Sequence, residues 1–314
     1  VDFGEWVSFS GIEFGRQVDF SEAKFEGRAS FSQVEFGGLA DFSGAKFEER
    51  ADFGSVNFGR DARFSGVEFR GQTSFLIVNF TGQADFGSAE FEKEADFSYA
   101  NFRGKVTLRR VEFDEKINFR DAVFTYRADF TGRNLHDSQF NNADLTDVAF
   151  VDASLISANL ESALLKQATL LSADLRGAKL SGTVLRDVQI NQETQFLEYY
   201  PDDNDSSTHA ISAARSQPFC VYDPEYQGDN MHESIDKAQS VYQTLEDLGE
   251  KHARAQLQRH SFIRRQELQK HKYRRTMLGQ KNEENPSWRK RLIASIRYSR
   301  AKIAQMIPMH DENR

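Results

Sequence analysis

The chain has 314 residues, a formal net charge of −8, 39% hydrophobic residues and a single cysteine, Cys220. One cysteine excludes a disulfide framework and is typical of a reducing compartment, so we expect a cytoplasmic protein. With 20 glycines and five prolines, the composition excludes a collagen-like or low-complexity chain, and no apolar run is long enough to predict a transmembrane helix. The 28 phenylalanines, against nine tyrosines and two tryptophans, indicate a repeated structural part.

Phenylalanine recurs at a fixed spacing in the first part of the chain. Starting at Phe3, the repeat centres are alternately six and five residues apart as far as Phe130, and Leu108 is the one centre in this stretch that is not phenylalanine. From Phe130 to Ile190 the centres are mostly leucine and are five residues apart. Internal repeats this short predict a solenoid, in which each coil buries its apolar residues against its neighbours.

A small apolar residue lies two positions before each centre, and the position between them is usually polar, as in Ala51-Asp52-Phe53. Apolar residues two apart indicate extended backbone with alternate side chains on one side. About three turn residues follow each pair, which excludes a helix and is too short for the strands of an ordinary meander. The pattern therefore predicts a short straight segment and a corner, repeated many times.

The segments ADFSGAKF at 40–47 and ANLESALL at 158–165 resemble the pentapeptide-repeat family. The resemblance covers residues 1–196. It implies a right-handed quadrilateral parallel β-helix with four repeats per coil, which gives about nine coils and, at the usual strand spacing, a length of about 44 Å. The expected fold class is therefore mainly β, with a smaller α-helical region after residue 230.

The size of the coil is expected to change along the solenoid. Four repeats take 22 residues where the centres are phenylalanine and 20 where they are mainly leucine, so the narrower core should have the shorter perimeter. The added residues lie at alternate corners, and most are long and polar, as Arg28, Arg50 and Lys116 are. Arg133, within the junction 131–138, takes the place of a small apolar residue, so we expect a bulge or a rearranged corner there.

Charge and pattern divide the chain into three stretches. Residues 1–196, the repeat domain, have a net charge of −10; residues 197–230, an acidic loop or cap linker, have −6; and residues 231–314, the helical region, have +8. A change of sign of this size predicts different surroundings for the two ends of the chain.

The helical region begins with a predicted hairpin. Apolar spacing predicts one helix over 231–249 that ends at Gly249, and a second over 250–278. Ala253, Leu257, Ile263 and Leu268 are the core candidates of the second helix.

A third helix is predicted over 286–307, with Asn285 as N-cap, Pro286 at its first position and no acidic residue within it. Three interpretations stay open: packing on the hairpin, contact with an anionic membrane surface, and contact with nucleic acid. The candidate residues for a membrane or partner contact are Trp288, Arg289, Lys290, Arg291, Arg297, Arg300 and Lys302.

No group of residues predicts a catalytic, cofactor or metal site. The seven histidines are scattered without metal-ligand spacing, and the sequence has no glycine-rich phosphate loop or nucleophile elbow. Asp203, Asp205 and Ser207 resemble the start of a calcium loop, but Thr208 and Ala214 stand where its glycine and glutamate belong, so we favour a solvated acidic loop. We expect no enzyme, no cofactor and no metal.

The architecture predicts a non-catalytic scaffold, a rigid rod that presents a polar face to a protein partner. The resemblance adds an alternative, because some family members imitate DNA to inhibit or protect gyrase. Duplex DNA carries about 26 charges over about 44 Å. Residues 1–196 have a net charge of only −10, so this alternative is the weaker one and we do not expect nucleic acid as a partner.

The resemblance also covers family members in which repeats and a basic helical segment precede a channel-like membrane domain. A rod peripheral to the membrane, or anchored to it through sequence beyond this chain, follows as an expectation. The repeat pattern is already in progress at Val1, which predicts a fragment of a longer chain or a first coil that is covered by another chain. Oligomerisation through this uncapped end is a further expectation.

Overall fold

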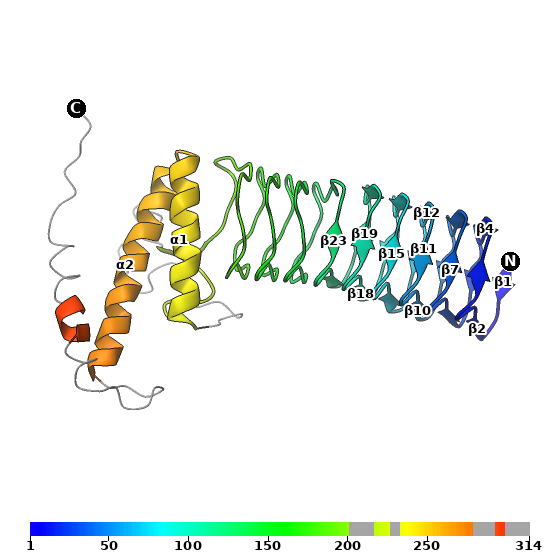
Figure 1. Cartoon of the computed structure of the whole chain (residues 1–314), viewed down its shortest axis with the longest axis horizontal. Coiled ribbons are helices and arrows are strands. Elements are labelled where there is room, and N and C mark those ends of the chain that lie inside the picture. Colours follow the sequence, from blue (N-terminus) through cyan, green and yellow to red (C-terminus); the bar gives the residue numbers. More distant parts are fainter. Residues whose placement is uncertain (201–216, 227–232, 279–292, 299–314) are drawn as a thin grey trace, which may run out of the picture. The chain divides into compact units, whose positions relative to one another are not determined.

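The computed structural model describes residues 1–200, 217–226, 233–278 and 293–298 (Figure 1). The chain forms two compact units. One comprises Val1–Val221 and Glu225–Met231, and the other comprises Tyr222–Pro224 and His232–Arg314. The first unit is a four-faced parallel β-solenoid, and the second contains the helices, so the predicted fold class is confirmed.

Each face of the solenoid is a parallel sheet of very short strands, one from each coil (Figure 1). Face A consists of β1 (Asp2–Phe3), β5 (Lys24–Phe25), β9 (Lys46–Phe47), β13 (Glu68–Phe69), β17 (Glu90–Phe91) and β21 (Glu112–Phe113). Face B consists of β2 (Trp6–Ser8), β6 (Arg28–Ser30), β10 (Ala51–Asp52), β14 (Thr73–Ser74), β18 (Ala95–Asp96) and β22 (Ile117–Asn118).

Face C consists of β3 (Glu13–Phe14), β7 (Glu35–Phe36), β11 (Asn57–Phe58), β15 (Asn79–Phe80), β19 (Asn101–Phe102) and β23 (Val123–Phe124). Face D consists of β4 (Val18–Asp19), β8 (Ala40–Asp41), β12 (Ala62–Arg63), β16 (Ala84–Asp85) and β20 (Val106–Thr107). The chain visits the faces in the order A, B, C, D and then starts the next coil.

Phenylalanine rings fill the interior as continuous stacks. The rings of Phe25 and Phe47 have centroids 4.5 Å apart and planes 2° apart, and the next step, from Phe47 to Phe69, is 5.1 Å. Rings from the opposite faces B and D meet edge to face, as Phe53 and Phe42 do at 5.4 Å. Both arrangements suit the quadrupole of an aromatic ring. The prediction that these phenylalanines stack at successive strand spacings is confirmed.

The polar position of the repeat explains how each corner closes. Asp52 Oδ1 accepts a hydrogen bond from the Gly54 N–H at 2.9 Å, which turns the chain directly after the strand. The same contact recurs in other repeats, at Asp19, Asp41, Asp85, Asp96, Asp129, Asp144 and Asp174. In many repeats the chain then passes through a left-handed residue, for example Ser55 at φ 59°.

The coil narrows as predicted, and it does so in two steps. Paired residues are 22 apart as far as Asn101 and Val123, 21 apart for Asn118 with Gln139, and 20 apart for Asn134 with Ser154. After β23 the pairs are single bridges rather than strands, and they continue to Asp174 and Gln195. In Figure 1 the strand arrows of the solenoid stop at β23, and the coils continue beyond it without arrows.

A short antiparallel pair follows the solenoid, formed by β24 (Glu198–Tyr200) and β25 (Gln217–Phe219). Cys220, directly after it, is buried. The segment 203–214, for which we expect a solvated acidic loop rather than a calcium loop, lies outside the described residues.

The second unit contains an antiparallel helix pair, α1 (Ile235–Lys251) and α2 (Ala255–Leu278) (Figure 1). Ser234 is the N-cap of α1. The prediction that the first helix ends at Gly249 is wrong. Gly249 lies inside α1, where a Cβ atom would come within 2.6 Å of the Gln258 backbone nitrogen, so glycine permits the close approach of the two helices.

The core of α2 differs from the prediction. Ile263 is 42% exposed and Ala253 lies exposed in the turn, whereas Leu268 is buried as predicted and Leu257 is half-buried. The helix is rotated so that Arg264, next to Ile263, faces inward. A short helix over 293–298 is also described, in which Ala294 is buried and Ile293 and Ile296 are exposed. Among the helices that the structure describes, none has the length and apolarity needed to cross a membrane.

Candidate functional site

The outer surface of the solenoid has ion pairs between successive coils on faces A and D. Glu68 on face A is paired with Lys46 of the preceding coil and with Arg70 at 2.8 Å, and on face D Arg63 contacts Asp41 at 3.1 Å. Hydrogen bonds from Lys46 above all, and then from Arg70, hold the pKa of the Glu68 carboxyl below its ordinary value, against the opposing effect of burial. These ion pairs neutralise part of the charge of faces A and D.

Face B exposes large apolar side chains at the corner where the chain leaves it for face C. Leu76 is 36% exposed, Ile77 is 56% exposed, and Tyr99, at the same corner one coil later, is 49% exposed. The corresponding corner positions of the earlier coils are Gly11, Gln33 and Ser55. We call Leu76, Ile77 and Tyr99 the apolar corner. Nothing in the repeat requires apolar residues there, so the apolar corner is a candidate contact surface.

The backbone conformation of Ile77 supports this interpretation. Its φ is 59°, in the left-handed region, and its N–H donates to the Ser98 carbonyl at 3.0 Å like those of its ladder neighbours. The ladder therefore forces this conformation, which is a genuine outlier for a β-branched residue and costs about 1–3 kcal/mol. A residue kept at such a cost and pointing outward is typical of a functional surface.

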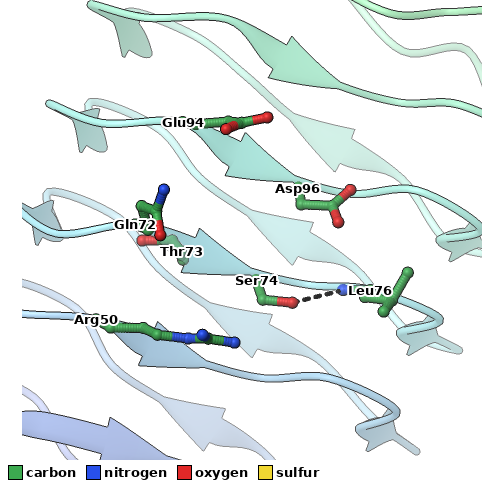
Figure 2. Close-up of a pocket in the computed structure, with 7 residues that line it drawn as sticks. All are labelled: Arg50, Gln72, Thr73, Ser74, Leu76, Glu94 and Asp96. Carbon is green, nitrogen blue, oxygen red and sulfur yellow. Dashed lines mark hydrogen bonds between the residues drawn. The ribbon is translucent and has the colours of Figure 1, made fainter.

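A shallow cavity of about 270 Å³ lies on the same face beside the apolar corner (Figure 2). Figure 2 shows Arg50, Gln72 and Glu94 on three successive coils along one edge of the face, with Leu76 at the opposite edge. Ser74 lies between them, and its Oγ accepts a hydrogen bond from the Leu76 N–H at 3.4 Å. The cavity thus combines an apolar side, a hydroxyl and charges of both signs.

The hydrogen-bond ladder is interrupted at the junction between the two coil sizes. In the preceding coil, the N–H groups of Ala84, Phe86 and Ser88 donate to carbonyls of the next coil at 2.8–3.0 Å. By the same pattern, the N–H groups of the first edge should donate to carbonyls of the second, from Val106, Leu108 and Arg110 to Arg127, Asp129 and Thr131. In the opposite direction, the N–H groups of Asn134 and His136 should donate to the carbonyls of Val111 and Phe113. None of these five bonds forms between residues 106–115 and 128–137, all of which the structure describes.

We call this pair of open edges, residues 106–115 and 128–137, the seam. It occupies faces D and A, whereas faces B and C stay paired through Asn118 with Gln139 and Val123 with Asp144. Arg133 lies half-buried at the seam, and its Nη1 donates to the Val111 carbonyl at 3.0 Å, in place of the Asn134 N–H. The predicted irregularity at Arg133 is therefore confirmed, although it extends over two faces.

The seam opens a cavity of about 500 Å³ on face A. Phe113 belongs to the phenylalanine stack of face A but is only half-buried at this point. Glu94, Asp114, Asn134 and His136 are among the other residues that line the cavity. Glu115 and Asp137 also line the cavity but have cationic partners, at 3.1 Å from Lys93 and 4.0 Å from Lys116. The cavity therefore joins an aromatic ring to a surplus of carboxylates.

The helical unit contains a buried polar cluster that the sequence did not predict. Asp223 is fully buried and accepts two hydrogen bonds from the Arg264 guanidinium at 2.8 Å each, and Tyr242 Oη donates to the same carboxylate at 2.8 Å. This bidentate pair ties the segment before α1 to both helices. The two charged residues are 41 positions apart, so no local pattern could have revealed them.

Most of the predicted contact residues of the basic segment lie outside the described residues: Trp288, Arg289, Lys290, Arg291, Arg300 and Lys302. Arg297 is exposed in the helix 293–298. No group of histidine, cysteine, aspartate or glutamate in the described part of the chain has the arrangement of a metal site.

Two profiles of pentapeptide repeats match the chain, one over residues 9–57 and 53–101 and the other over 126–161 and 149–187. The stretch between them, 102–125, includes the first edge of the seam. No curated protein matches the chain.

Similar solved structures include HetL, a pentapeptide repeat protein involved in heterocyst differentiation regulation from the cyanobacterium Nostoc sp. strain PCC 7120. It is 20% identical over 66% of this chain and 94% of its own, with a TM-score of 0.25. A trypsin-treated form of QnrB1, a plasmid-mediated fluoroquinolone resistance protein, is 15% identical over 60% of this chain and 93% of its own, with a TM-score of 0.27. Rfr23 from the cyanobacterium Cyanothece 51142 is 19% identical over 43% and 87%, with a TM-score of 0.17.

The repeat pattern, the two profile matches and the four-faced solenoid that the repeats build lead to one conclusion. The chain belongs to the pentapeptide-repeat family.

Proposed function

We propose that the chain is a non-catalytic protein-interaction scaffold, whose solenoid is a rigid rod and whose face B docks a protein partner. The observation that carries the proposal is Ile77, which is outward, 56% exposed and held at a φ of 59°. A scaffold with no contact on face B would gain stability from asparagine or glycine at this corner. The proposal includes no catalytic step.

The nearby groups suit a protein partner better than a small molecule. The apolar corner supplies aromatic and aliphatic surface, and Arg120 lies 6.0 Å over the Tyr99 ring. The adjacent cavity adds a hydroxyl at Ser74 and both charge signs at Arg50 and Glu94. An apolar centre with polar groups around it is the usual anatomy of a protein interface.

The DNA-mimic alternative is less well supported by the surface. A mimic needs carboxylates that are not neutralised, whereas Glu68, Asp41 and Glu48 each contact an arginine or lysine. These ion pairs lower the density of unneutralised negative charge that an imitation of a phosphate backbone would need.

Site-specific photocrosslinking in the native host tests the docking face. We expect a photoreactive residue at position 77 to give one discrete adduct, and the same residue at Glu13, exposed on face C, to give none. The double variant Leu76→Ser with Tyr99→Ser should abolish the adduct without changing the melting temperature. Identical adducts from positions 77 and 13, or an adduct that is indifferent to the double variant, would contradict the proposal.

A further inference from the structure

We propose that the seam is a second docking site, which binds an extended segment of a partner protein through its backbone and holds an arginine or lysine of that segment beside Phe113. This site is separate from face B, and its test is independent of the function proposed there. Three features of the seam support it: the open strand edges, the half-buried ring and the charge of the cavity.

The open edges supply the backbone pairing. The N–H groups of Val106, Leu108 and Arg110 and the carbonyl of Phe113 lie at ladder positions but have no backbone partner among residues 106–137, although their counterparts one coil earlier are paired. Unpaired edges of this kind are templates for an added strand. Faces B and C stay paired across the junction, so the solenoid continues while the backbone ladder of faces D and A is interrupted.

Phe113 supplies a partly exposed aromatic surface beside the seam. Its ring lies 5.4 Å from that of Phe91 in the preceding coil, and the half-buried side chain lines the cavity. The phenylalanines of the same stack from Phe25 to Phe91 are buried. An exposed ring face attracts a guanidinium or ammonium group, an interaction of about 0.5–2 kcal/mol.

The charge of the cavity favours a cationic occupant. Glu94 and Asp114 line it, and neither makes an ion pair with any residue that the structure describes. Guanidinium and carboxylate groups form strong charge-assisted hydrogen bonds, and a planar guanidinium can at the same time lie on an aromatic ring. An extended segment with an arginine therefore matches the backbone, the ring and the carboxylates together.

The probe for this site is a short synthetic peptide of alternating threonine and valine with a central arginine, measured by fluorescence anisotropy on the whole chain. Two matched peptides are the controls, one with glutamate at the centre and one with N-methylated backbone amides. We expect each change to weaken binding about tenfold or more, which corresponds to about 1.4 kcal/mol. Equal binding of the arginine and glutamate peptides would overturn the charge argument, and indifference to N-methylation would overturn the strand pairing.

Variants of the chain locate the binding. Asp114→Asn, on the exposed wall of the cavity, should weaken the arginine peptide, whereas the control Glu13→Gln on face C should not. Arg133→Ala restores the small inward residue that Ala153 provides one coil later, where it is buried. This variant should close the seam and abolish peptide binding. Unchanged binding to Asp114→Asn and to Arg133→Ala would place the peptide elsewhere and overturn the proposal.

Hydrogen exchange reports the same site without depending on affinity. In the free chain the amides of Val106, Leu108 and Arg110 should exchange faster than those of Ala84, Phe86 and Ser88. The arginine peptide, or the Arg133→Ala substitution, should slow them. If the amides instead become protected as the protein concentration rises in the absence of peptide, a second copy of this chain occupies the seam. That result would contradict a separate partner. Slow exchange of these amides in the free dilute chain would mean that no open edge exists.

Discussion

Phe64 and Phe86 lie ring over ring in successive coils, with centroids 4.9 Å apart and planes 5° apart. Phe42 stacks on the other side of Phe64 at 5.1 Å, so the Phe64 ring is covered on both faces and is fully buried. The rigid neighbours above and below leave little room for the core to collapse around a missing ring.

Phe64→Ala should therefore lower the free energy of unfolding by about 3–5 kcal/mol, because it leaves a cavity in the stack. Arg50→Ala, at an exposed corner, should change it by no more than about 0.5 kcal/mol. Denaturant titration of the two variants checks the difference. Similar effects would mean that the inward and outward positions of the repeat are reversed.

Ile77→Asn should raise stability by about 1 kcal/mol, because asparagine tolerates the left-handed conformation that the ladder imposes on this position. Ser55→Asn, at the same corner one coil earlier, is the control, and it should have a smaller effect because serine is not β-branched. Thermal melts of both variants make the comparison. A destabilised Ile77→Asn would show that the isoleucine side chain contributes packing rather than strain.

Asp223→Ala should lower the stability of the helical unit by about 3–5 kcal/mol, because it leaves the buried Arg264 guanidinium without its carboxylate. The control is Asp236→Ala, whose carboxylate is 74% exposed and contacts Lys272, where we expect less than about 1 kcal/mol. Circular dichroism follows the helices during thermal unfolding. Equal loss in both variants would indicate that the cluster does not hold the unit together.

Glu68 should make stability depend on pH in the acid range. Its pKa is lowered below the ordinary value of 4.5, chiefly by its hydrogen bond from Lys46. Its contribution is therefore complete above pH 4.5 and is lost as the pH falls through the lower folded value. Melts across this range should show Glu68→Gln less stable than the parent near neutrality, with the gap closing in acid. A gap that is constant with pH would contradict the assignment.

The basic segment 286–307 should bind anionic membranes. Its six positive charges contribute about 1 kcal/mol each near an anionic leaflet, whereas the acidic solenoid is repelled from that surface. Co-sedimentation with anionic vesicles should be strong at low salt, weak at high salt and absent for a chain that ends at residue 284. Zwitterionic vesicles are the control. If the whole chain ignores anionic vesicles at low salt, the segment has no membrane role of its own.

The regular part of the fold could be predicted from the sequence because every repeat has the same pattern of inward and outward residues. The spacing of the phenylalanines gives the inward positions, and the change from six-and-five to five gives the narrowing of the coil. Arg133 indicated an irregular corner, because a guanidinium group is too large and too polar for the position of a small buried residue. These inferences succeeded because neighbours in the solenoid are set by a constant sequence offset.

The remaining features depend on contacts between residues whose separation in the sequence does not follow the repeat. The pairing of Asp223 with Arg264 turns α2 so that Ile263 faces outward, and apolar spacing alone could not show that a charged residue would take the inward position. The conformation of Ile77 did leave a signal, since an isoleucine stands where earlier coils have glycine, glutamine and serine. Which two faces open at Arg133 follows from how coils of 22 and 21 residues overlap, which the sequence pattern does not specify.

The seam also divides the solenoid as a cooperative structure. In a repeat array, each coil is stabilised by its neighbours. Partial unfolding of one end therefore extends as far as the weakest interface between two coils. At the junction faces B and C keep their backbone pairing between the phenylalanine coils and the leucine coils, whereas the seam is crossed by the side-chain hydrogen bond from Arg133 to Val111. The two series therefore behave as blocks joined by a weak link, and the most accessible partly unfolded state is one in which a single block has melted up to Arg133.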